Sequence, residues 1–440
     1  MFRSPTFRFV AGLLAAALAA PVAAANLQDV MDWLTAHADA PVDGLAPGTY
    51  GADRLDDLRA YLPPRYVEEF DFPELVLELA PTRHYQAHAS YRAATERFAG
   101  QASIGPAGRL DGYVAGKPFS TAQILAADAD TAGFMVAYDQ IHRWQNYGYR
   151  NETLISFIQP TADGQAGNLS EGMRGGGHVE RSVELLYQRV YFSRLAQEAD
   201  NDYRLDVDGS DELLYKEYLE MLAPFDIAGL KIIVERPLDQ TLGDQVNSYL
   251  PTERRVRRLS AKERADSWIG TNWTLDDFEG FSGIVMDNDW RYLGRKVVLA
   301  VANSRENPPQ FHGPMSIVPY DRWQLRPCFV VEAIPRWDGH PYGRRLMFVD
   351  EETGTIPMTL VFDRAGELVK TFAMVYAHVD DVDTAPIERS MSMWRASMAI
   401  DYVARNANIA ADHEASTEYV AVKSSQVKKI FSVSNLGSGR

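Results

Sequence analysis

Residues 131–385 contain a long succession of short apolar segments that are rich in Val, Ile, Tyr and Phe and separated by turn residues. The segments with this strand-like character are 133–144, 152–159, 178–195, 215–222, 228–238, 244–251, 296–302, 323–335, 343–350, 355–363 and 368–379. Short turn signals, among them Asp338-Gly339 and Thr353-Gly354, separate the later segments. Such short connections join antiparallel neighbours, whereas parallel strands need crossovers of about a dozen residues or more. The sequence therefore predicts a mainly β protein of the α+β class, built on an antiparallel meander.

The regions on either side of this series have a different pattern. Residues 27–39 place apolar side chains at helical spacing, and helix and loop signals alternate up to residue 110. After the series, residues 387–405 are predicted to form one helix, and residues 416–436 one or two strands. The predicted organisation is a helical and loop-rich N-terminal region (26–110), an antiparallel β domain (111–385) and a C-terminal helix and strand extension (386–440).

The first 25 residues have the features of a signal peptide. Arg3 and Arg8 precede an apolar stretch over residues 9–24, which ends in the small residues that signal peptidase recognises. A stretch of about 16 residues is short for a membrane anchor, which needs roughly 20. The only cysteine, Cys328, lies far from the predicted cleavage site, so the chain is not expected to be a lipoprotein. We therefore expect residues 1–25 to be cleaved and the mature protein to be periplasmic.

Charge and motifs exclude several classes of function. The chain has 60 acidic and 44 basic residues and a formal net charge of -16, which argues against a nucleic-acid partner because that affinity depends on neutralised phosphates. Metalloprotease, C-x-x-C and G-x-S-x-G motifs are absent from the sequence. No catalytic residue, metal site or cofactor is predicted, and the chain is expected not to be an enzyme. A hydrolase acting on a hydrophobic or glycan substrate is the weaker alternative, since carboxylate pairs are available.

A candidate ligand site lies in the irregular stretch after residue 260. Large apolar side chains are placed there between turn residues, namely Trp268, Trp273, Phe278, Phe281 and Met286. Aromatic residues in Gly-rich irregular sequence indicate a loop that is folded onto an apolar surface. Two interpretations are open: the loop fills the protein's own core, or it forms a lid over a ligand cavity.

An arginine cluster directly precedes this stretch. Four arginines lie within residues 254–258. On a strand, Arg255 and Arg257 share one face, while Arg254 and Arg258 share the other. One pair is expected to meet acidic residues of the next segment, Asp276, Asp277 and Glu279, in a structural ion-pair network. The alternative is that Arg255 and Arg257 lie at the rim of a cavity and bind the head group of a ligand.

Several stretches together resemble a family of Gram-negative periplasmic proteins defined as a domain of unknown function and similar in fold to the lipoprotein carriers LolA and LolB. The stretches are PELVLELAPTRHY (73–85), ATERFAG (94–100), GYVAGKPF (112–119), YLPTERRVRRL (249–259), TLDDFEGFSG (274–283), DWRYLGRK (289–296), FVVEAIP (329–335) and RRLMFVDEETG (344–354). The resemblance implies a curved, incomplete antiparallel β-barrel whose apolar concave face is covered by helices, with a helical N-terminal extension.

The resemblance also implies a function. LolA-like proteins hold acyl chains in the half-barrel, so a periplasmic carrier or chaperone for a lipid or another hydrophobic molecule is expected. Members of the resembled family are often encoded near an RND-type inner-membrane transporter and an outer-membrane β-barrel protein, which are the implied protein partners. An adaptor that docks to such a partner without a ligand is the alternative function. The family has no established catalytic residues to carry over.

Overall fold

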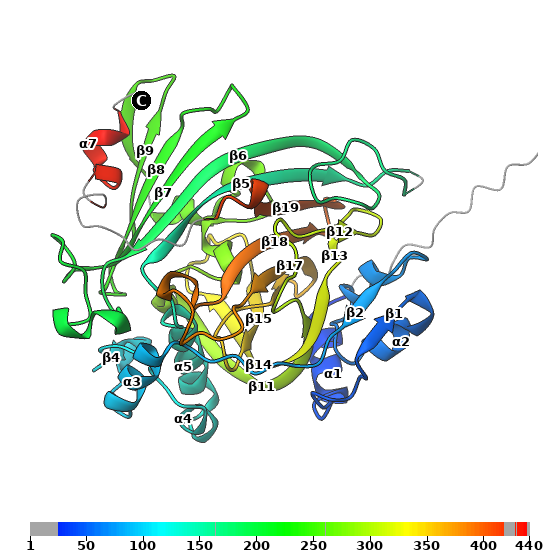
Figure 1. Ribbon diagram of the computed structural model, residues 1–440, viewed down its shortest axis with the longest axis horizontal. Helices are drawn as coiled ribbons and strands as arrows, with labels where there is room; N and C mark the ends of the chain where they lie inside the picture. Colours follow the sequence, from blue (N-terminus) through cyan, green and yellow to red (C-terminus); the bar gives the residue numbers. More distant parts are fainter. Residues whose placement is uncertain (1–24, 163, 260, 418–426, 428, 438–440) are drawn as a thin grey trace, which may run out of the picture.

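The computed structural model describes residues 25–162, 164–259, 261–417, 427 and 429–437, so the predicted signal peptide lies outside the described residues except for Ala25. Within this part of the chain, one 15-stranded sheet runs in the order β1-β2-β14-β15-β16-β17-β18-β19-β5-β6-β7-β8-β9-β10, with β11 also paired to β14 (Figure 1). The path has two ends, β1 and β10, so the sheet is open. Figure 1 shows β5 and β6 arching over the top of the molecule while β11 and β14 curve beneath it. The prediction of a mainly β fold built on an open, incomplete barrel is therefore confirmed.

The strands form two antiparallel meanders. The first comprises β5 (Gly148–Gln159), β6 (His178–Tyr191), β7 (Leu213–Ala223), β8 (Lys231–Pro237), β9 (Gln245–Leu250) and β10 (Arg255–Leu259). The second comprises β11 (Asn288–Ala300), β14 (Arg322–Pro335), β15 (Arg344–Asp350), β16 (Met358–Phe362), β17 (Leu368–Ala377), β18 (Met393–Asp401) and β19 (Asn406–Asp412). Strands β19 and β5 pair with each other and thereby join the two meanders. Two short strands, β12 (Phe311–His312) and β13 (Val318–Pro319), pair separately.

The first predicted strand, 133–144, is wrong: most of this segment belongs to helix α5 (Ala129–Ile141). The Asp128 side chain caps the helix by accepting hydrogen bonds from the backbone N–H groups of Asp130 and Thr131. The helix is buried on almost all sides, so its sequence lacks the polar face that distinguishes an amphipathic helix from a buried strand. Gly133 lets it approach the sheet, because a Cβ there would lie 2.6 Å from the backbone nitrogen of Arg291 on β11.

The predicted C-terminal helix over 387–405 is also wrong, because this segment contains β18. Strand β18 lies in the middle of the sheet, where Met393 pairs with Ala377 and Asp401 pairs with Lys370. Nearly every residue of β18 is buried, and a strand covered on both faces shows no alternation in its sequence. The sheet therefore continues past the predicted boundary at residue 385. Much of the strand predicted over 416–436 lies outside the described residues, and Val433–Leu436 forms helix α7.

The N-terminal region contributes both short helices and strands. Its helices are α1 (Leu27–Ala36), α2 (Leu55–Leu58) and α3 (Ala89–Arg97), and α4 (Thr121–Ala126) follows. Its strands are β1 (Gly48–Tyr50), β2 (Leu77–Leu79), β3 (Ser103–Ile104) and β4 (Leu110–Asp111). Strand β2 pairs in parallel with the start of β14, so part of this region belongs to the main sheet. None of the helices in the described part of the chain is long and apolar enough to cross a membrane.

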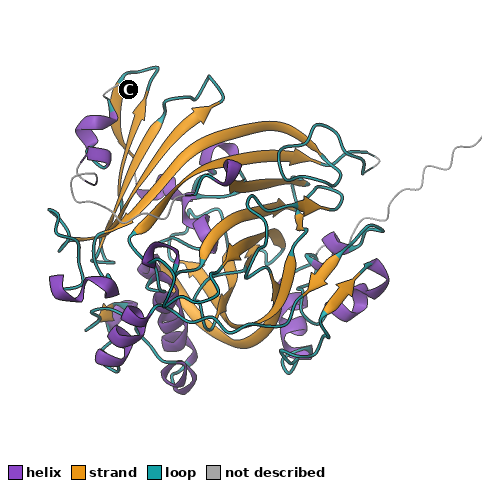
Figure 2. Cartoon of the chain, viewed as in Figure 1, coloured by secondary structure: helices purple, strands orange, loops and turns teal. Residues whose placement is uncertain are grey.

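Both faces of the sheet are covered by apolar layers. On β14, Phe329 and Val331 belong to the core that contains α5, whereas Cys328 and Val330 belong to the core that contains α1. In the second core, Trp33 of α1 packs edge-on against Phe348 of β15, with 6.1 Å between ring centroids. Figure 2 shows α3–α5 and α1–α2 grouped at opposite sides of the view. The α5 side of the sheet also carries the candidate site.

Candidate ligand cavity

The irregular stretch that connects β10 to β11, residues 261–287, is here called the aromatic segment. It consists of four short 3-10 helices, Ala261–Ala265, Trp268–Gly270, Leu275–Gly280 and Val285–Asp287. It crosses the sheet at the second meander, where the Asn272 backbone N–H donates to Asn408 Oδ1 at 2.7 Å and Lys370 Nζ donates to the Asn272 carbonyl at 2.9 Å. The segment therefore lies against β17 and β19.

Buried ion pairs hold the aromatic segment in place. Asp277 accepts two hydrogen bonds from Arg345 at 3.0 and 3.1 Å, and the side chains of both residues are at most 1% exposed. Glu279 pairs with Arg143 of the chain after α5, and its other oxygen accepts from the Tyr149 hydroxyl at 2.8 Å. Because each buried charge has a partner of opposite sign, the segment is firmly anchored at these positions.

Asp276 forms an ion pair within the segment with Arg264, whose Nε donates to Asp276 Oδ1 at 2.8 Å, and Arg264 in turn pairs with the buried Asp244 just before β9. Burial alone would raise the pKa of the Asp276 carboxyl, but the nearby guanidinium of Arg264 and that of Arg345 outweigh burial and lower it. The ionised form of Asp276 is therefore favoured in the folded protein.

A cavity lies between the aromatic segment and strands β5, β6, β7, β18 and β19. Its empty volume is about 720 Å³, part of it open to solvent. Its apolar and aromatic lining consists of Ile155, Leu185, Tyr187, Leu219, Trp268, Trp273, Leu275, Phe278, Trp394 and Ala410. Its polar lining consists of Asn151, Thr153, Glu217, Thr274, Asp277, Glu279 and Ser397. The strand residues alternate along their strands, as in 151, 153 and 155 of β5, because alternate side chains share a face.

The carboxylates in the cavity wall are neutralised by arginines. Besides Asp277 and Glu279, Glu217 lines the cavity, and its Oε1 accepts from Arg189 Nε and Nη2 at 3.0 and 2.6 Å. The Tyr187 hydroxyl also donates to this oxygen at 2.7 Å. The cavity wall therefore has polar groups at fixed positions but carries no uncompensated negative charge.

Two polar atoms of the lining residues have no hydrogen-bond partner within the described part of the chain. These atoms are the buried donor Trp268 Nε1 and the buried acceptor Asn151 Oδ1. A buried polar group without a partner costs about 1–3 kcal/mol. An acceptor on a ligand would match Trp268 Nε1, and a donor would match Asn151 Oδ1.

The structure brings together three of the five predicted aromatic-segment residues, since Trp268, Trp273 and Phe278 all line the cavity. Phe281 is only 2% exposed and packs edge-on against Trp290 at 5.1 Å between ring centroids. Met286 lines a different hollow, together with Arg336 and Trp337. Ligand binding by these residues stays a prediction, and Phe281 and Met286 lie apart from the cavity.

The predicted ion pairs of the arginine cluster are wrong. Arg255 and Arg257 lie on β10, an edge strand, where both are exposed, and Arg257 pairs with Glu253. The acidic residues of the aromatic segment pair instead with Arg264, Arg345 and Arg143. Exposed charge on an edge strand has a simpler role, because it discourages pairing with the edge of another chain. Neither residue lines the cavity.

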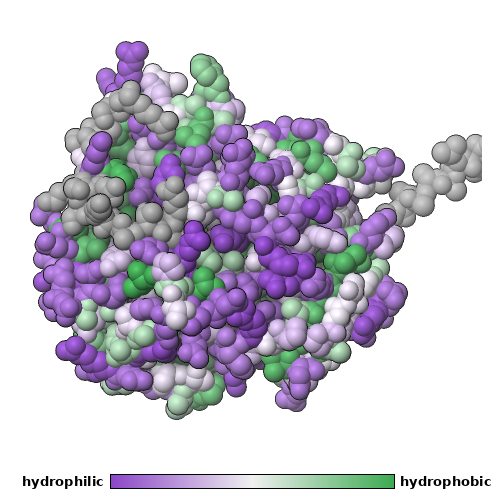
Figure 3. Space-filling view, viewed as in Figure 1, coloured by the Kyte–Doolittle hydropathy of each residue, from purple (hydrophilic) through white to green (hydrophobic). Residues whose placement is uncertain are grey.

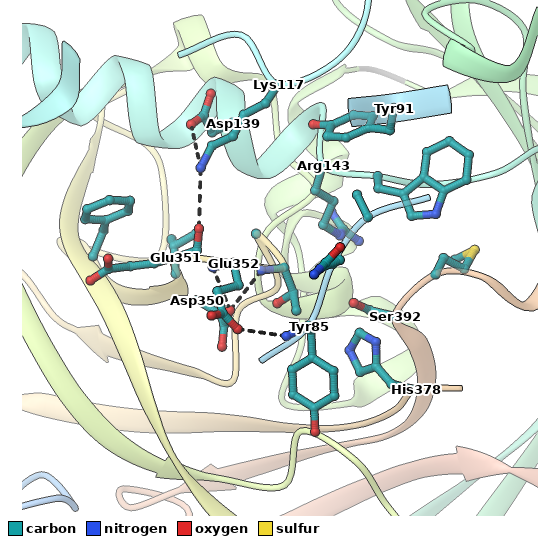
Figure 4. Close-up of a pocket in the computed structure, with 18 of the residues that line it drawn as sticks. Tyr85, Tyr91, Lys117, Asp139, Arg143, Asp350, Glu351, Glu352, His378 and Ser392 are labelled. Carbon is teal, nitrogen blue, oxygen red and sulfur yellow. Dashed lines mark hydrogen bonds and ion pairs between the residues drawn. The ribbon is translucent and has the colours of Figure 1, made fainter. Parts of the chain in front are cut away.

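A second, more polar pocket lies between α3, α5 and the turn after β15 (Figure 4). At its centre, Lys117 Nζ lies 3.7 Å from Asp139 Oδ2 and donates to the Glu351 carbonyl at 3.4 Å. Asp139 Oδ1 accepts from the Phe119 backbone N–H, while Oδ2 is buried beyond hydrogen-bonding distance of a partner in the described structure. Burial raises the pKa of Asp139 to about 7, against the opposing effect of Lys117. Sequence reasoning missed this pocket because it assigned Asp139 to a strand.

Asp139 gives a pH-dependent prediction. The unfolded carboxyl releases its proton near its ordinary pKa of 3.8 and the folded one near 7, so over this range the folded state binds more protons and loses stability as the pH rises. Between about pH 5 and pH 8 we expect the unfolding free energy of the wild type to fall by about 2 kcal/mol more than that of Asp139→Asn. Urea unfolding at several pH values measures this difference.

The matched control for this experiment is Asp130→Asn on the same helix. Asp130 is exposed and forms a surface ion pair with Arg291, so its substitution should leave the pH dependence of unfolding as in the wild type. Parallel pH profiles for the wild type and Asp139→Asn would contradict the raised pKa of Asp139.

The fold and the cavity define the class of this protein as an open, mainly antiparallel half-barrel with an interior aromatic cavity. Its sequence matches the model of DUF1329, a family of proteins of unknown function, over residues 52–437. The chain belongs to this family, which confirms the predicted membership of a family of unknown function. Among curated proteins, none matches the chain.

Solved structures similar to the chain include three proteins of low sequence identity. A DUF1329 family protein from Desulfovibrio piger has 15% identity and a TM-score of 0.46, covering 70% of this chain and 100% of the other. A putative outer membrane lipoprotein-sorting protein domain from Vibrio parahaemolyticus has 14% identity and a TM-score of 0.44, covering 70% and 98%. A LolA superfamily protein from Nitrosomonas europaea has 10% identity and a TM-score of 0.38, covering 68% and 97%.

Proposed function

We propose that this protein is a periplasmic carrier or chaperone that binds a lipid or another hydrophobic molecule in the cavity beneath the aromatic segment. The observation that supports the proposal most strongly is the aromatic lining of this cavity by Trp268, Trp273 and Phe278, facing the sheet residues Ile155 and Leu219. Each methylene group removed from water contributes about 0.8 kcal/mol, so an acyl or sterol ligand with a dozen such groups would gain roughly 10 kcal/mol before the costs of binding.

The polar lining suggests what the ligand carries at one end. Trp268 Nε1 offers a hydrogen and Asn151 Oδ1 accepts one, whereas the lining carboxylates already have arginine partners. Hydroxyl or amide groups would match these unpaired atoms without introducing a charge. A neutral amphiphile therefore fits the cavity better than a fatty acid, because the arginines near the cavity already pair with Glu217, Asp277 and Glu279 and would not neutralise another carboxylate.

The alternative is an adaptor that docks to an outer-membrane β-barrel protein or an RND-type transporter without carrying a ligand. The observation in its favour is that buried ion pairs anchor the aromatic segment, as is expected if the segment itself fills the core and leaves no place for a ligand. Phe225, at the turn between β7 and β8, is 98% exposed and would suit a protein contact. Figure 3 shows mostly hydrophilic residues on the visible face, with apolar residues in small separate groups.

A cavity-filling substitution tests the carrier function. Ala410 lines the cavity from β19, so Ala410→Phe should occupy the space that a ligand needs. We expect the wild type to bind the apolar dye N-phenyl-1-naphthylamine and to yield a co-purified lipid on organic extraction and mass spectrometry. Ala410→Phe should bind the dye at least tenfold more weakly.

Ala404→Phe is the control, because Ala404 is exposed in the turn between β18 and β19 and receives the same side chain outside the cavity. It should retain both dye and lipid. If the wild type repeatedly yields no lipid and binds no dye, the carrier function is excluded and the adaptor function gains support. Equal dye binding by all three proteins would place the apolar site elsewhere.

A further inference from the structure

Arg194 differs from the other inward-facing arginines of the described structure. Arg143, Arg189 and Arg345 each lie against a carboxylate, as do Arg236, Arg264 and Arg326. Arg194, in the connection that follows β6, is partly buried, and within the described part of the chain its hydrogen-bond partners are backbone carbonyls and not a carboxylate. Its φ of 64° is unusual for a residue with a side chain, so the local backbone is held in a costly conformation that orients this arginine.

The protein contacts of Arg194 use only part of its guanidinium group. Nη1 donates to the backbone carbonyls of Tyr113 and Val114 at 2.7 and 3.2 Å. The guanidinium carbon lies 5.3 Å from the centre of the Tyr113 ring. Carbonyl oxygens are neutral acceptors, so these contacts position the cation without neutralising it. The remaining N–H donors of a guanidinium form a planar fork that matches a carboxylate or phosphate.

Arg194 lines a cavity that is separate from the aromatic one. Its empty volume is about 560 Å³, and its wall includes Tyr113, His142, Leu214, Leu238 and Gln240. The leucines give the cavity an apolar side. Gln240 contributes a buried side-chain oxygen without a partner in the described structure. Rotation of the terminal amide by half a turn would present an N–H donor at that position of the same cavity.

The other ionisable groups around this cavity leave the charge of Arg194 uncompensated. His142 is neutral, because burial and the charge of Arg194 lower its pKa to about 3. Asp239 also lines the cavity, but it is exposed and its carboxylate accepts hydrogen bonds from the backbone N–H and the hydroxyl of Thr241 instead of from Arg194. Arg109 also lines the cavity and forms an exposed ion pair with Asp111. Burial lowers the pKa of Arg194 itself, the direction expected for a cation that lacks a counter-ion.

We propose that the Arg194 cavity is a second ligand site, which binds the carboxylate or phosphate group of an organic anion. The oxyanion would accept hydrogen bonds from the free edge of the Arg194 guanidinium. The apolar part of the same molecule would pack against Leu214 and Leu238. The site differs in charge from the aromatic cavity, so the two would select different classes of molecule.

Four probes test the site by isothermal titration calorimetry at constant ionic strength: octanoate, octyl phosphate and 1-octanol, which share an octyl-sized chain, and inorganic phosphate, which has no chain. The titrations are made on the wild type and on Ala410→Phe, in which the aromatic cavity is filled. We expect octanoate and octyl phosphate to bind both proteins saturably, and 1-octanol to bind Ala410→Phe at least tenfold more weakly than octanoate does. Inorganic phosphate lacks the octyl chain. If it binds as tightly as octyl phosphate, the site recognises the phosphate group alone, and if it binds more weakly, the apolar chain contributes to binding. Arg194→Gln should weaken the binding of both organic anions at least tenfold.

Arg204→Gln is the control, because Arg204 lies in the same connection between β6 and β7 and pairs with Asp202 away from the cavity. It should bind all four probes as the wild type does. If Arg194→Gln does not fold, Arg194→Lys retains the charge but loses the planar fork, and it should bind the anions more weakly than the wild type. The proposal is overturned if no anion binds the wild type, if 1-octanol binds Ala410→Phe as well as octanoate does, or if the Arg194 variant that folds binds the anions unchanged.

Discussion

Asp277→Ala is expected to lower the free energy of unfolding by about 3–5 kcal/mol, because it leaves the guanidinium of Arg345 buried without a counter-ion. The Arg345 side chain is 1% exposed, so water cannot replace the lost carboxylate without local opening. The substitution also removes the acceptor of the Tyr342 hydroxyl, at 2.8 Å, and of the Thr274 backbone N–H, at 2.7 Å. Equilibrium unfolding in urea measures the loss.

A double substitution separates the cost of the unpaired charge from the loss of packing. Asp277→Ala combined with Arg345→Met removes both charges, so it should regain a large part of the stability that Asp277→Ala loses. Asp289→Ala is the control, since its ion pair with Arg336 is largely exposed and its loss should cost less than about 1 kcal/mol. A loss below about 1 kcal/mol for Asp277→Ala itself would show that the aromatic segment opens readily to water.

The sequence predicts the strands of this fold far better than its buried helix. Turn signals and β-branched residues identify most strands of both meanders. The sequence predicts a strand where helix α5 lies and a helix where strand β18 lies, because both are buried on almost all sides. Neither element shows the polar stripe of an amphipathic helix or the alternation of a half-buried strand. The pairing of β19 with β5 joins residues about 250 positions apart, such as Asn408 and Phe157, and no local pattern indicates such a contact.

The candidate site shows the same limit at the level of side chains. The aromatic residues of the aromatic segment stand out by composition, and three of them line the cavity. Its ion pairs do not stand out: Asp277 meets Arg345, 68 residues away, and Glu279 meets Arg143, 136 residues away. The arginine cluster of β10 lies closer along the chain to these two acidic residues than Arg345 or Arg143 does, but the sheet carries β10 to an exposed edge. Proximity in sequence therefore identifies the pair of Asp276 with Arg264 but not the partners of Asp277 and Glu279.

The anchoring of the aromatic segment constrains how a ligand would enter. A lid that opens as a whole would have to separate the buried pairs of Asp277 and Glu279, each at a cost of several kcal/mol. Trp268 is less constrained: it is partly buried, its indole N–H has no partner in the described structure, and it lies between Arg264 and Asn272, which are themselves held by buried contacts. The segment therefore combines residues that ion pairs hold in place with an aromatic side chain, that of Trp268, that they do not hold. The interpretations of the segment as core and as lid therefore predict different effects for different residues.

Phe281→Ala and Trp268→Ala are expected to separate these two roles. Phe281 is 2% exposed against Trp290, so its truncation leaves a core cavity and should cost about 3–5 kcal/mol of stability. Dye uptake by the molecules that remain folded should stay at the wild-type level, because Phe281 does not line the ligand cavity. Trp268→Ala should cost less stability and weaken dye uptake severalfold.

Unfolding in urea and titration with N-phenyl-1-naphthylamine, performed on both variants, measure the two effects independently. Trp273→Ala provides an internal check, since Trp273 is 7% exposed and also lines the cavity, so it should lower both stability and uptake. If Trp268→Ala and Trp273→Ala both reduce stability and leave uptake unchanged, the whole aromatic segment is core. The apolar ligand would then have to bind outside this cavity, because Phe278 is the only other aromatic residue of the described segment that lines it.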